Sequence, residues 1–222
     1  MNDFPLEFTV AQKRSLAKDV LLCELALSGG EDFVFHPGQY LSLLIPDGGE
    51  MKERSFSIAS HPEKDVIDII IKMRAGGIAS HFFSSVAIGE KIHGSMPEGK
   101  FVLDEKEQPS VFICAGAGIA PIIPMVIELL KKRTTEEPVQ LLFYKEPEGY
   151  DELIMQLESL SSDHPHFKYN IVTDEGESTQ YLSGCDDSLT GFYICGGPEF
   201  VVAMRSQLVE KGVSGEDIHF EQ

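Results

Sequence analysis

Hydrophobic and polar residues follow two different patterns along this chain. Up to about residue 100 the apolar runs are short and turn residues separate them, whereas later apolar runs alternate with stretches of helical period. Short, closely spaced strands indicate a small antiparallel barrel or sandwich. Alternating strands and helices are typical of a parallel sheet wrapped by helices. The sequence therefore predicts two domains, an antiparallel β-barrel at residues 1–104 followed by an α/β parallel-sheet domain at residues 105–222.

These patterns also place the individual elements. In the first domain we expect strands at residues 20–27, 40–45, 55–59, 66–73 and 91–94, and one short helix at residues 78–86. In the second we expect strands at residues 111–115, 139–144, 167–172 and 191–195, and helices at residues 121–132, 151–160 and 199–211. Ligands of such a parallel sheet bind beyond the carboxyl ends of its strands. The turns that follow these strands are therefore the first place to look for chemistry.

The charge balance restricts the partners. The chain has 222 residues, of which 18 are basic and 36 acidic, so its formal net charge is −18. A field of this sign opposes binding to nucleic acid or to an anionic membrane surface. Residues 111–127, a long stretch without a charge, contain two glycines and two prolines, and a strand, turn and helix explain them better than a membrane span does. We therefore expect neither a nucleic-acid partner nor a membrane span.

Cysteine and histidine spacing predicts no metal site. The amino-terminal residues lack the form of a secretory signal, and scattered thiols are compatible with a reducing cytoplasm, so a cytoplasmic location is expected. The histidines form no HxH or HxxxH pair on a plausible helix, since His164 and His166 flank Pro165 in a loop, and we expect them to face solvent. The four cysteines contain no CxxC pair; they are Cys23, Cys114, Cys185 and Cys195.

The segment from Arg54 to Ser60 carries the first candidate chemistry. It presents an arginine, an aromatic ring and two serines on an extended stretch, and we expect them to form one row projecting to one side. A guanidinium suits a pyrophosphate, a flat ring can lie against an isoalloxazine, and a hydroxyl can bond a ring nitrogen. An ordinary strand with a polar face explains the same residues, so the segment alone leaves both interpretations open.

Two glycine-rich turns follow apolar strands in the second half. The first runs from Gly116 to Pro121, where glycines let the backbone approach a pyrophosphate and start a helix whose amino end favours the anion. The second, Cys195-Gly196-Gly197-Pro198, leaves space for a planar ring beside a small polarizable thiol. Each turn could also be a tight connection with nothing bound, and Cys195 could be an ordinary buried cysteine.

Five motifs in order give the chain a family resemblance. The row at Arg54, the segments Gly77–Ser80 and Pro97–Phe101, and the two glycine turns together resemble the ferredoxin-NADP reductase family, over about residues 8–221. The resemblance implies a flavin-binding barrel, usually holding FAD, joined to a nicotinamide-nucleotide domain. It further implies hydride transfer from the nicotinamide C4 to the flavin N5, followed by release of electrons to an acceptor.

The resemblance also implies roles for particular residues. Arg54 would pair with the flavin phosphates, Phe56 would lie against the flavin and Ser57 would bond near its N5. The candidate catalytic residues are Ser57, Cys195 and Glu221. The start of the short helix would cradle the pyrophosphate, through Gly77, Ile78, Ala79 and Ser80. The nicotinamide nucleotide would be held by Gly116, Ala117, Gly118 and Pro121, with Cys195, Gly196, Gly197 and Pro198 beside the nicotinamide.

Departures from the family pattern are informative. Phe56 stands where tyrosine is common, which removes one hydroxyl bond and weakens flavin retention. Ala117 replaces a frequent threonine. After Phe220 and Glu221 the chain lacks the aromatic residue that covers the flavin in plant-type members, and Phe220 itself is expected to be a core residue.

The coenzyme and the acceptor are predicted more coarsely. The strand ends at Lys145-Glu146 and Thr173-Asp174-Glu175 carry carboxylates that repel a 2′-phosphate, so NADH is favoured over NADPH, and Lys145 is the residue most able to reverse this choice. The predicted function is an NADH-dependent flavoprotein reductase that serves a protein acceptor such as a ferredoxin or an oxygenase component. The alternatives are a reductase that releases reduced free flavin and a non-catalytic FAD-binding relay subunit. Positive charge in the barrel half could form a docking patch, from Lys13, Arg14, Lys18, Lys52, Arg54, Lys72 and Arg74.

Overall fold

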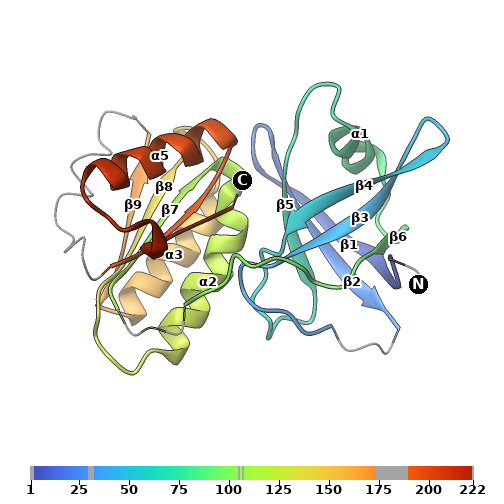
Figure 1. Ribbon diagram of the computed structural model, residues 1–222. Coiled ribbons are helices and arrows are strands. Elements are labelled where there is room, and N and C mark those ends of the chain that lie inside the picture. Colours follow the sequence, from blue (N-terminus) through green and yellow to red (C-terminus); the bar gives the residue numbers. More distant parts are fainter. Residues whose placement is uncertain (1–2, 30–32, 105, 107, 174–189, 222) are drawn as a thin grey trace.

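The computed structural model contains two β-sheets that lie side by side, each with its own helices (Figure 1). It describes residues 3–29, 33–104, 106, 108–173 and 190–221. No helix within these residues combines the length and the apolar character that a membrane crossing needs.

The first sheet is antiparallel and has six strands in the order β4-β3-β6-β1-β2-β5. It curls like a barrel without closing, and a single bridge between Ile58 and Ile69 links its two edges. Helix α1 (Ile78–Ser85) packs against it through Phe83. The strands are β1 (Leu6–Ala17), β2 (Val20–Ser28), β3 (Tyr40–Asp47), β4 (Glu50–Ser57), β5 (Ile67–Lys72) and β6 (Lys91–Gly94).

The sequence pattern missed β1 altogether. Its first half alternates in the way a half-buried strand should, with Leu6, Phe8 and Val10 in the core. The register then shifts between Val10 and Gln12, and the polar residues that follow break the alternation. The hydrophobic signal is therefore too short to mark a strand of 12 residues.

The second sheet is parallel, with five strands in the order β11-β10-β7-β8-β9. Phe112 and Cys114 of β7 face α2 and α3, whereas Val111 and Ile113 face α5. The strands are β7 (Ser110–Ala115), β8 (Val139–Tyr144), β9 (Phe167–Val172), β10 (Gly191–Cys195) and β11 (Ile218–Glu221). The helices are α2 (Ile119–Lys132), α3 (Asp151–Asp163) and α5 (Pro198–Glu210), with 3-10 turns η1 (Gly116–Gly118) and η3 (Gly215–Asp217).

The predicted fold class is confirmed by these two sheets. The boundary placed between residues 104 and 105 falls in the connection between Gly94 and Ser110 and stays a prediction. Helix α2 lies at the junction of the two halves (Figure 1), and its apolar face shares one core cluster with Leu16, Leu22 and Ile70 of the first sheet. The halves are therefore packed together through an apolar contact.

Polar contacts across this junction correct one expectation. His61 does not face solvent: its side chain is 11% exposed, and Nε2 lies 2.8 Å from a carboxylate oxygen of Glu128 on α2. A second polar contact joins the two halves, in which Arg14 of β1 pairs with Glu152 of α3 at 2.8 Å. A histidine that joins two domains has no local sequence signal, because its partner is distant in the chain.

Candidate functional site

The structure brings the three candidate catalytic residues together at the junction. Ser57 lies at the end of β4, and its hydroxyl donates a hydrogen bond of 2.8 Å to Oε2 of Glu221 at the end of β11. Cys195 ends β10 and is the register partner of Glu221 in the adjacent parallel strand. Residues from two domains and three distant positions in the sequence therefore meet at the carboxyl edge of the parallel sheet.

Burial controls the protonation of this group. Burial raises the pKa of Glu221, and the hydrogen bond from Ser57 opposes this rise only in part. Burial also raises the pKa of the Cys195 thiol, and the nearby Glu221 carboxylate adds to the effect. The Cys195 thiol therefore stays protonated, and it lines the site rather than acting as a nucleophile. Glu221 can hold a proton at a higher pH than an exposed glutamate can.

The two glycine-rich turns pack against each other beside these residues. A Cβ placed on Gly118 would lie 2.7 Å from the carbonyl carbon of Cys195 and closer still to its oxygen. A Cβ on Gly196 would lie 2.7 Å from the Phe200 ring, whereas one on Gly197 would meet nothing within 4 Å. Gly118 and Gly196 are therefore required by packing, whereas Gly197 borders open space.

The helix after the first turn starts slightly earlier than its sequence indicates. Gly116 has a φ of +54°, and the 3-10 turn that it shares with Ala117 and Gly118 leads directly into α2 at Ile119. Pro121 is the third residue of α2, still within the turn whose N–H groups lack intrahelical partners. This arrangement retains the backbone approach expected for a pyrophosphate site.

A cavity of about 970 Å³ opens next to this turn, between the β1–β2 hairpin and the ends of β7, β8 and β9. Its volume is of the size that a nucleotide needs. Lys145, only 8% exposed, lines it but donates to the carbonyl oxygens of Glu146 at 2.7 Å and Pro147 at 3.1 Å. The lining residues are Ala17, Lys18, Asp19, Val20, Lys72, Ala115, Gly116, Tyr144, Lys145, Glu146, Pro147, Glu148, Gly149, Tyr150, Val172, Thr173 and Phe200. Asp174 and Glu175, which also entered the coenzyme prediction, lie outside the described residues.

The row at Arg54 differs from its prediction. Strand alternation puts Arg54 and Phe56 on one face of β4 and the two serines on the other, so the four side chains do not project together. The Phe56 ring packs edge-on against Phe83 at 5.5 Å. Ser55 bonds the hydroxyl of Ser42 at 3.0 Å. Arg54 donates to the carbonyl oxygen of Glu53 at 2.6 Å, which leaves the rest of its guanidinium for an anion.

The start of α1 fits a phosphate. Gly77 precedes the helix and borders a hollow of about 580 Å³ together with Arg74, Ile78 and Ser80. A Cβ on Gly77 would lie 3.0 Å from the Ser80 hydroxyl, which accepts the backbone N–H of Arg74 at 2.7 Å. Ala79 packs toward the core, so it could contribute only its backbone. Exposed N–H groups, a nearby arginine and the missing Cβ match the needs of the FAD pyrophosphate.

Sequence reasoning missed three features of the site. Tyr150 has a φ of +66°, lines the nucleotide cavity and is buried, and this burial raises its pKa to about 12. Its neighbour Gly149 contacts the β1–β2 hairpin of the first domain, and Pro147 and Gly149 are the turn signals that could have drawn attention to the loop. Phe220 is not a core residue: it is 38% exposed, and the Arg205 guanidinium lies 3.9 Å above its ring.

Comparison with known proteins gives one family match and many relatives. Residues 7–103 match the family described as the oxidoreductase FAD-binding domain. The electron transfer component of toluate 1,2-dioxygenase from Pseudomonas putida is 26% identical, over 96% of this chain and 66% of that protein. A Bacillus subtilis flavohemoprotein is 30% identical, over 96% of this chain and 58% of that protein. The chain thus spans about half to two thirds of the length of the curated relatives that it matches.

Solved structures agree with the fold. The Amycolatopsis cytochrome P450 reductase GcoB superposes with a TM-score of 0.87 at 24% identity, covering 98% of this chain and 69% of that one. A ferredoxin NADP+ reductase from Neisseria gonorrhoeae, solved with FAD and NADP, gives a TM-score of 0.84 at 18% identity, covering 100% of this chain and 99% of that one. The two-sheet arrangement is therefore the fold that this chain shares with both structures.

Proposed function

We propose that this chain, whose residues 7–103 match the oxidoreductase FAD-binding domain family, works as ferredoxin-NADP reductases do: it oxidises NADH through FAD and passes the electrons to a protein acceptor. The observation that carries this proposal is the bond of 2.8 Å between Ser57 and Glu221 beside Cys195. This group lies where the end of β4 in the flavin-binding domain meets the carboxyl edge of the parallel sheet.

The residues of the chain supply position, shape and a proton-holding group. FAD, when bound, accepts two electrons together and releases them singly. Gly77 and Ser80 would hold its pyrophosphate, and Phe56 offers a flat apolar surface. Glu221 and Ser57 would hold a proton near the reacting ring, and the space beside Gly197 would admit the nicotinamide. Alignment of two bound rings in a site of limited solvent access is the main contribution of the protein to such a reaction.

The preference for NADH rests on the charges of the nucleotide cavity. Lys145 is engaged by two carbonyl oxygens, and Glu146 and Glu148 line the same cavity. The carboxylates would therefore repel the 2′-phosphate of NADPH, and Lys145 could bind this phosphate only by giving up its two hydrogen bonds to carbonyl oxygens. The ribose diol of NADH can donate hydrogen bonds to these carboxylates.

An anaerobic titration tests the function and the coenzyme together. We expect the flavin absorbance to bleach with NADH, and kcat/KM for NADH to exceed that for NADPH by about tenfold or more, the size of one unfavourable charge contact. Before the titration, the amount of flavin per chain is measured on protein that has passed through gel filtration. Absence of bleaching with both coenzymes would refute the proposed function, and preference for NADPH would refute the role given to Lys145.

A second candidate function is reduction of free flavin. It is favoured by Phe56, which lacks the hydroxyl that would anchor a bound flavin. Loss of all flavin during the same gel filtration, with NADH oxidation that saturates in added FAD or FMN, would support it. Flavin that remains at one equivalent per chain supports a bound cofactor instead.

The surface charge bears on the acceptor. Five of the seven basic residues of the proposed docking patch already contact oxygen atoms of the protein: Lys13 the carbonyl of Phe83 at 3.0 Å, Arg14 the carboxylates of Glu24 and Glu152, Lys52 that of Glu50, Arg54 the carbonyl of Glu53, and Lys72 the carboxylate of Asp19. Little positive charge is left there to attract an acidic protein. The relatives named as an electron transfer component and a P450 reductase serve oxygenases, and we propose an acceptor of that kind with a neutral or basic docking face.

Salt dependence tests this proposal. With an acidic plant-type ferredoxin as the probe, the second-order rate of electron transfer is expected to rise about threefold or more between about 20 and 300 mM NaCl, because salt screens the repulsion. The measurement is stopped-flow reduction of the ferredoxin by the pre-reduced protein. A rate that falls with salt would reveal an attractive patch and overturn the proposal.

A further inference from the structure

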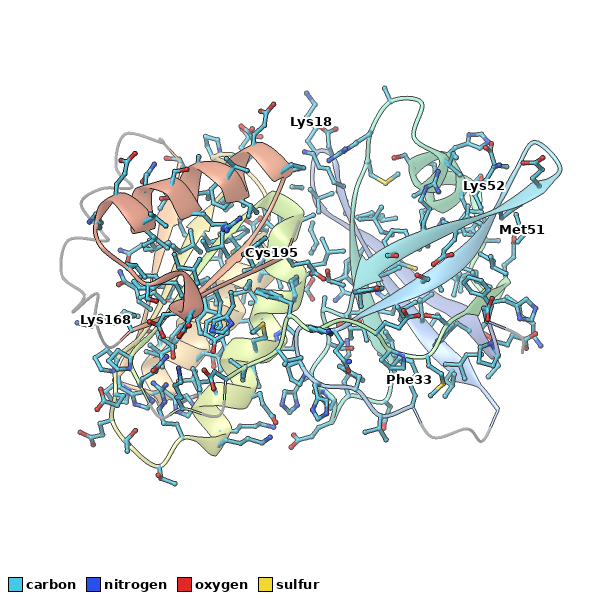
Figure 2. The ribbon with its side chains drawn as sticks, in the orientation of Figure 1. Lys18, Phe33, Met51, Lys52, Lys168 and Cys195 are labelled. Carbon is cyan, nitrogen blue, oxygen red and sulfur yellow. The ribbon has the colours of Figure 1, made fainter. Side chains whose placement is uncertain are left out.

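The nucleotide cavity takes one of its walls from the flavin-binding domain. The hairpin between β1 and β2 contributes Lys18 and Asp19, and β5 contributes Lys72. Figure 2 shows Lys18 between the two halves of the molecule, on the same side as the start of α5. The electrostatics of the cavity therefore depend on both domains.

Contacts between the domains fix the position of this hairpin. The backbone N–H of Tyr150 donates to the carbonyl oxygen of Leu16 at 2.5 Å. A Cβ on Gly149 would lie 2.6 Å from the Cβ of Ala17, so only glycine permits this approach. Because Lys18 follows Ala17 directly, its backbone is held against the loop that lines the opposite side of the cavity.

The cavity has more carboxylates than available cations. Asp19, Glu146 and Glu148 line it, and a nucleotide diphosphate would add further negative charge. Lys145 is occupied by carbonyl oxygens, and Nζ of Lys72 lies 3.9 Å from a carboxylate oxygen of Asp19.

Lys18 differs from these two lysines. It is exposed, and no carboxylate of the described residues lies within 4.0 Å of its Nζ. A flexible four-carbon stem carries this charge at the rim, within reach of a ligand that fills the cavity. Lys18 is therefore the lining cation with the least competition from the protein itself.

From these observations we propose that Lys18, a residue of the flavin-binding domain, binds the diphosphate of the nicotinamide nucleotide and positions it for reaction. This inference rests on the proposed function and deepens it, since it makes the coenzyme site a product of both domains. The expected specificity is for the diphosphate that NADH and NADPH share, and not for the 2′-phosphate.

Calorimetry with unreactive ligands tests the inference. In the FAD-loaded Lys18→Gln variant, the Kd of ADP-ribose is expected to rise about tenfold, the effect of one charge-assisted contact. The Kd of 2′-phospho-ADP-ribose should rise by the same factor, and Lys18→Arg should restore most of the affinity. The matched control is Lys168→Gln, which removes an exposed charge on β9, far from Lys18 in Figure 2, and should change either Kd less than about twofold.

Three outcomes would overturn the inference. They are an unchanged Kd in Lys18→Gln, an equal loss in Lys168→Gln, and a loss confined to 2′-phospho-ADP-ribose. The last would assign Lys18 to the 2′-phosphate. If the unsubstituted protein binds neither ligand and its flavin does not bleach with NADH, the proposed function fails as well. If it binds and bleaches, an unchanged Lys18→Gln variant refutes this inference alone.

Discussion

Replacement of Ser57 by alanine is expected to slow NADH-driven flavin reduction about a hundredfold, the typical cost of removing one positioned hydroxyl or donor from a reacting site. The hydroxyl bonds Glu221 at 2.8 Å across the domain junction. Its loss leaves the partly buried carboxyl of Glu221 without the partner that orients it. Stopped-flow measurement at saturating NADH isolates this step from coenzyme binding.

Ser55 provides the matched control for this prediction. It lies two residues earlier on β4, and its hydroxyl bonds Ser42 rather than a residue of the second domain. Ser55→Ala should therefore leave the limiting reduction rate within about threefold of its original value, as a surface substitution away from the site does. Equal rates in Ser55→Ala and Ser57→Ala would remove Ser57 from the proposed machinery.

The raised pKa of Glu221 gives the same group a signature in stability. Burial disfavours the ionised carboxylate in the folded protein, so the protonated form stabilises the fold at low pH. That contribution is complete below the ordinary pKa of 4.5 and is lost as the pH rises through the raised value. Glu221→Gln cannot ionise, and its Oε1 can still accept the Ser57 bond.

The difference in unfolding free energy between Glu221→Gln and the unsubstituted protein should therefore shift in favour of the variant as the pH rises above 4.5. Urea unfolding at several pH values measures it. A difference that does not change with pH would show that Glu221 ionises as an ordinary exposed glutamate. In that case the proton-holding role proposed for Glu221 would lose its basis.

The parallel sheet was predictable almost residue by residue. The strands expected at residues 139–144, 167–172 and 191–195 coincide with β8, β9 and β10. The two interior strands β8 and β10 are mostly apolar because both of their faces are covered, whereas the edge strand β9 also carries Lys168 and Asn170. The short β11 escaped prediction, since four residues at the end of the described chain give no periodic signal. The polar first half of β4 was also not predicted, because an edge strand can be stable without a hydrophobic run.

Some residues of the candidate site can be located from local sequence patterns, whereas others depend on contacts between residues far apart in the chain. The glycine turns at Gly116 and Gly196 are local patterns that follow apolar strands, and sequence alone locates them. The roles of Lys18 and His61 depend on how two domains dock, and docking is set by complementary surfaces far apart in the chain. Residue patterns within either domain contain no signal for such contacts.

Replacement of Gly118 by alanine is expected to separate the two glycine-rich turns that form the nicotinamide site. The added Cβ would lie 2.7 Å from the carbonyl carbon of Cys195 and 2.9 Å from Cα of Gly196. Both are backbone atoms, so no side-chain rotation can relieve the overlap. We expect a loss of about 1–3 kcal/mol in unfolding free energy, the usual cost of overpacking. The Kd of ADP-ribose should rise more than about tenfold, because correct geometry of both turns is needed to receive the nucleotide.

Two glycines with free space around them separate crowding from other effects of alanine. A Cβ on Gly215 or on Gly197 would meet nothing within 4 Å, so both variants should keep their stability within about 0.5 kcal/mol, as for surface substitutions. Gly215 lies outside the candidate site and should also retain ADP-ribose binding. Gly197 lies beside Cys195, where the nicotinamide would approach, so Gly197→Ala should slow flavin reduction in a stable protein. If Gly118→Ala keeps both stability and ADP-ribose affinity, the two turns do not need the close packing from which the nicotinamide site is inferred.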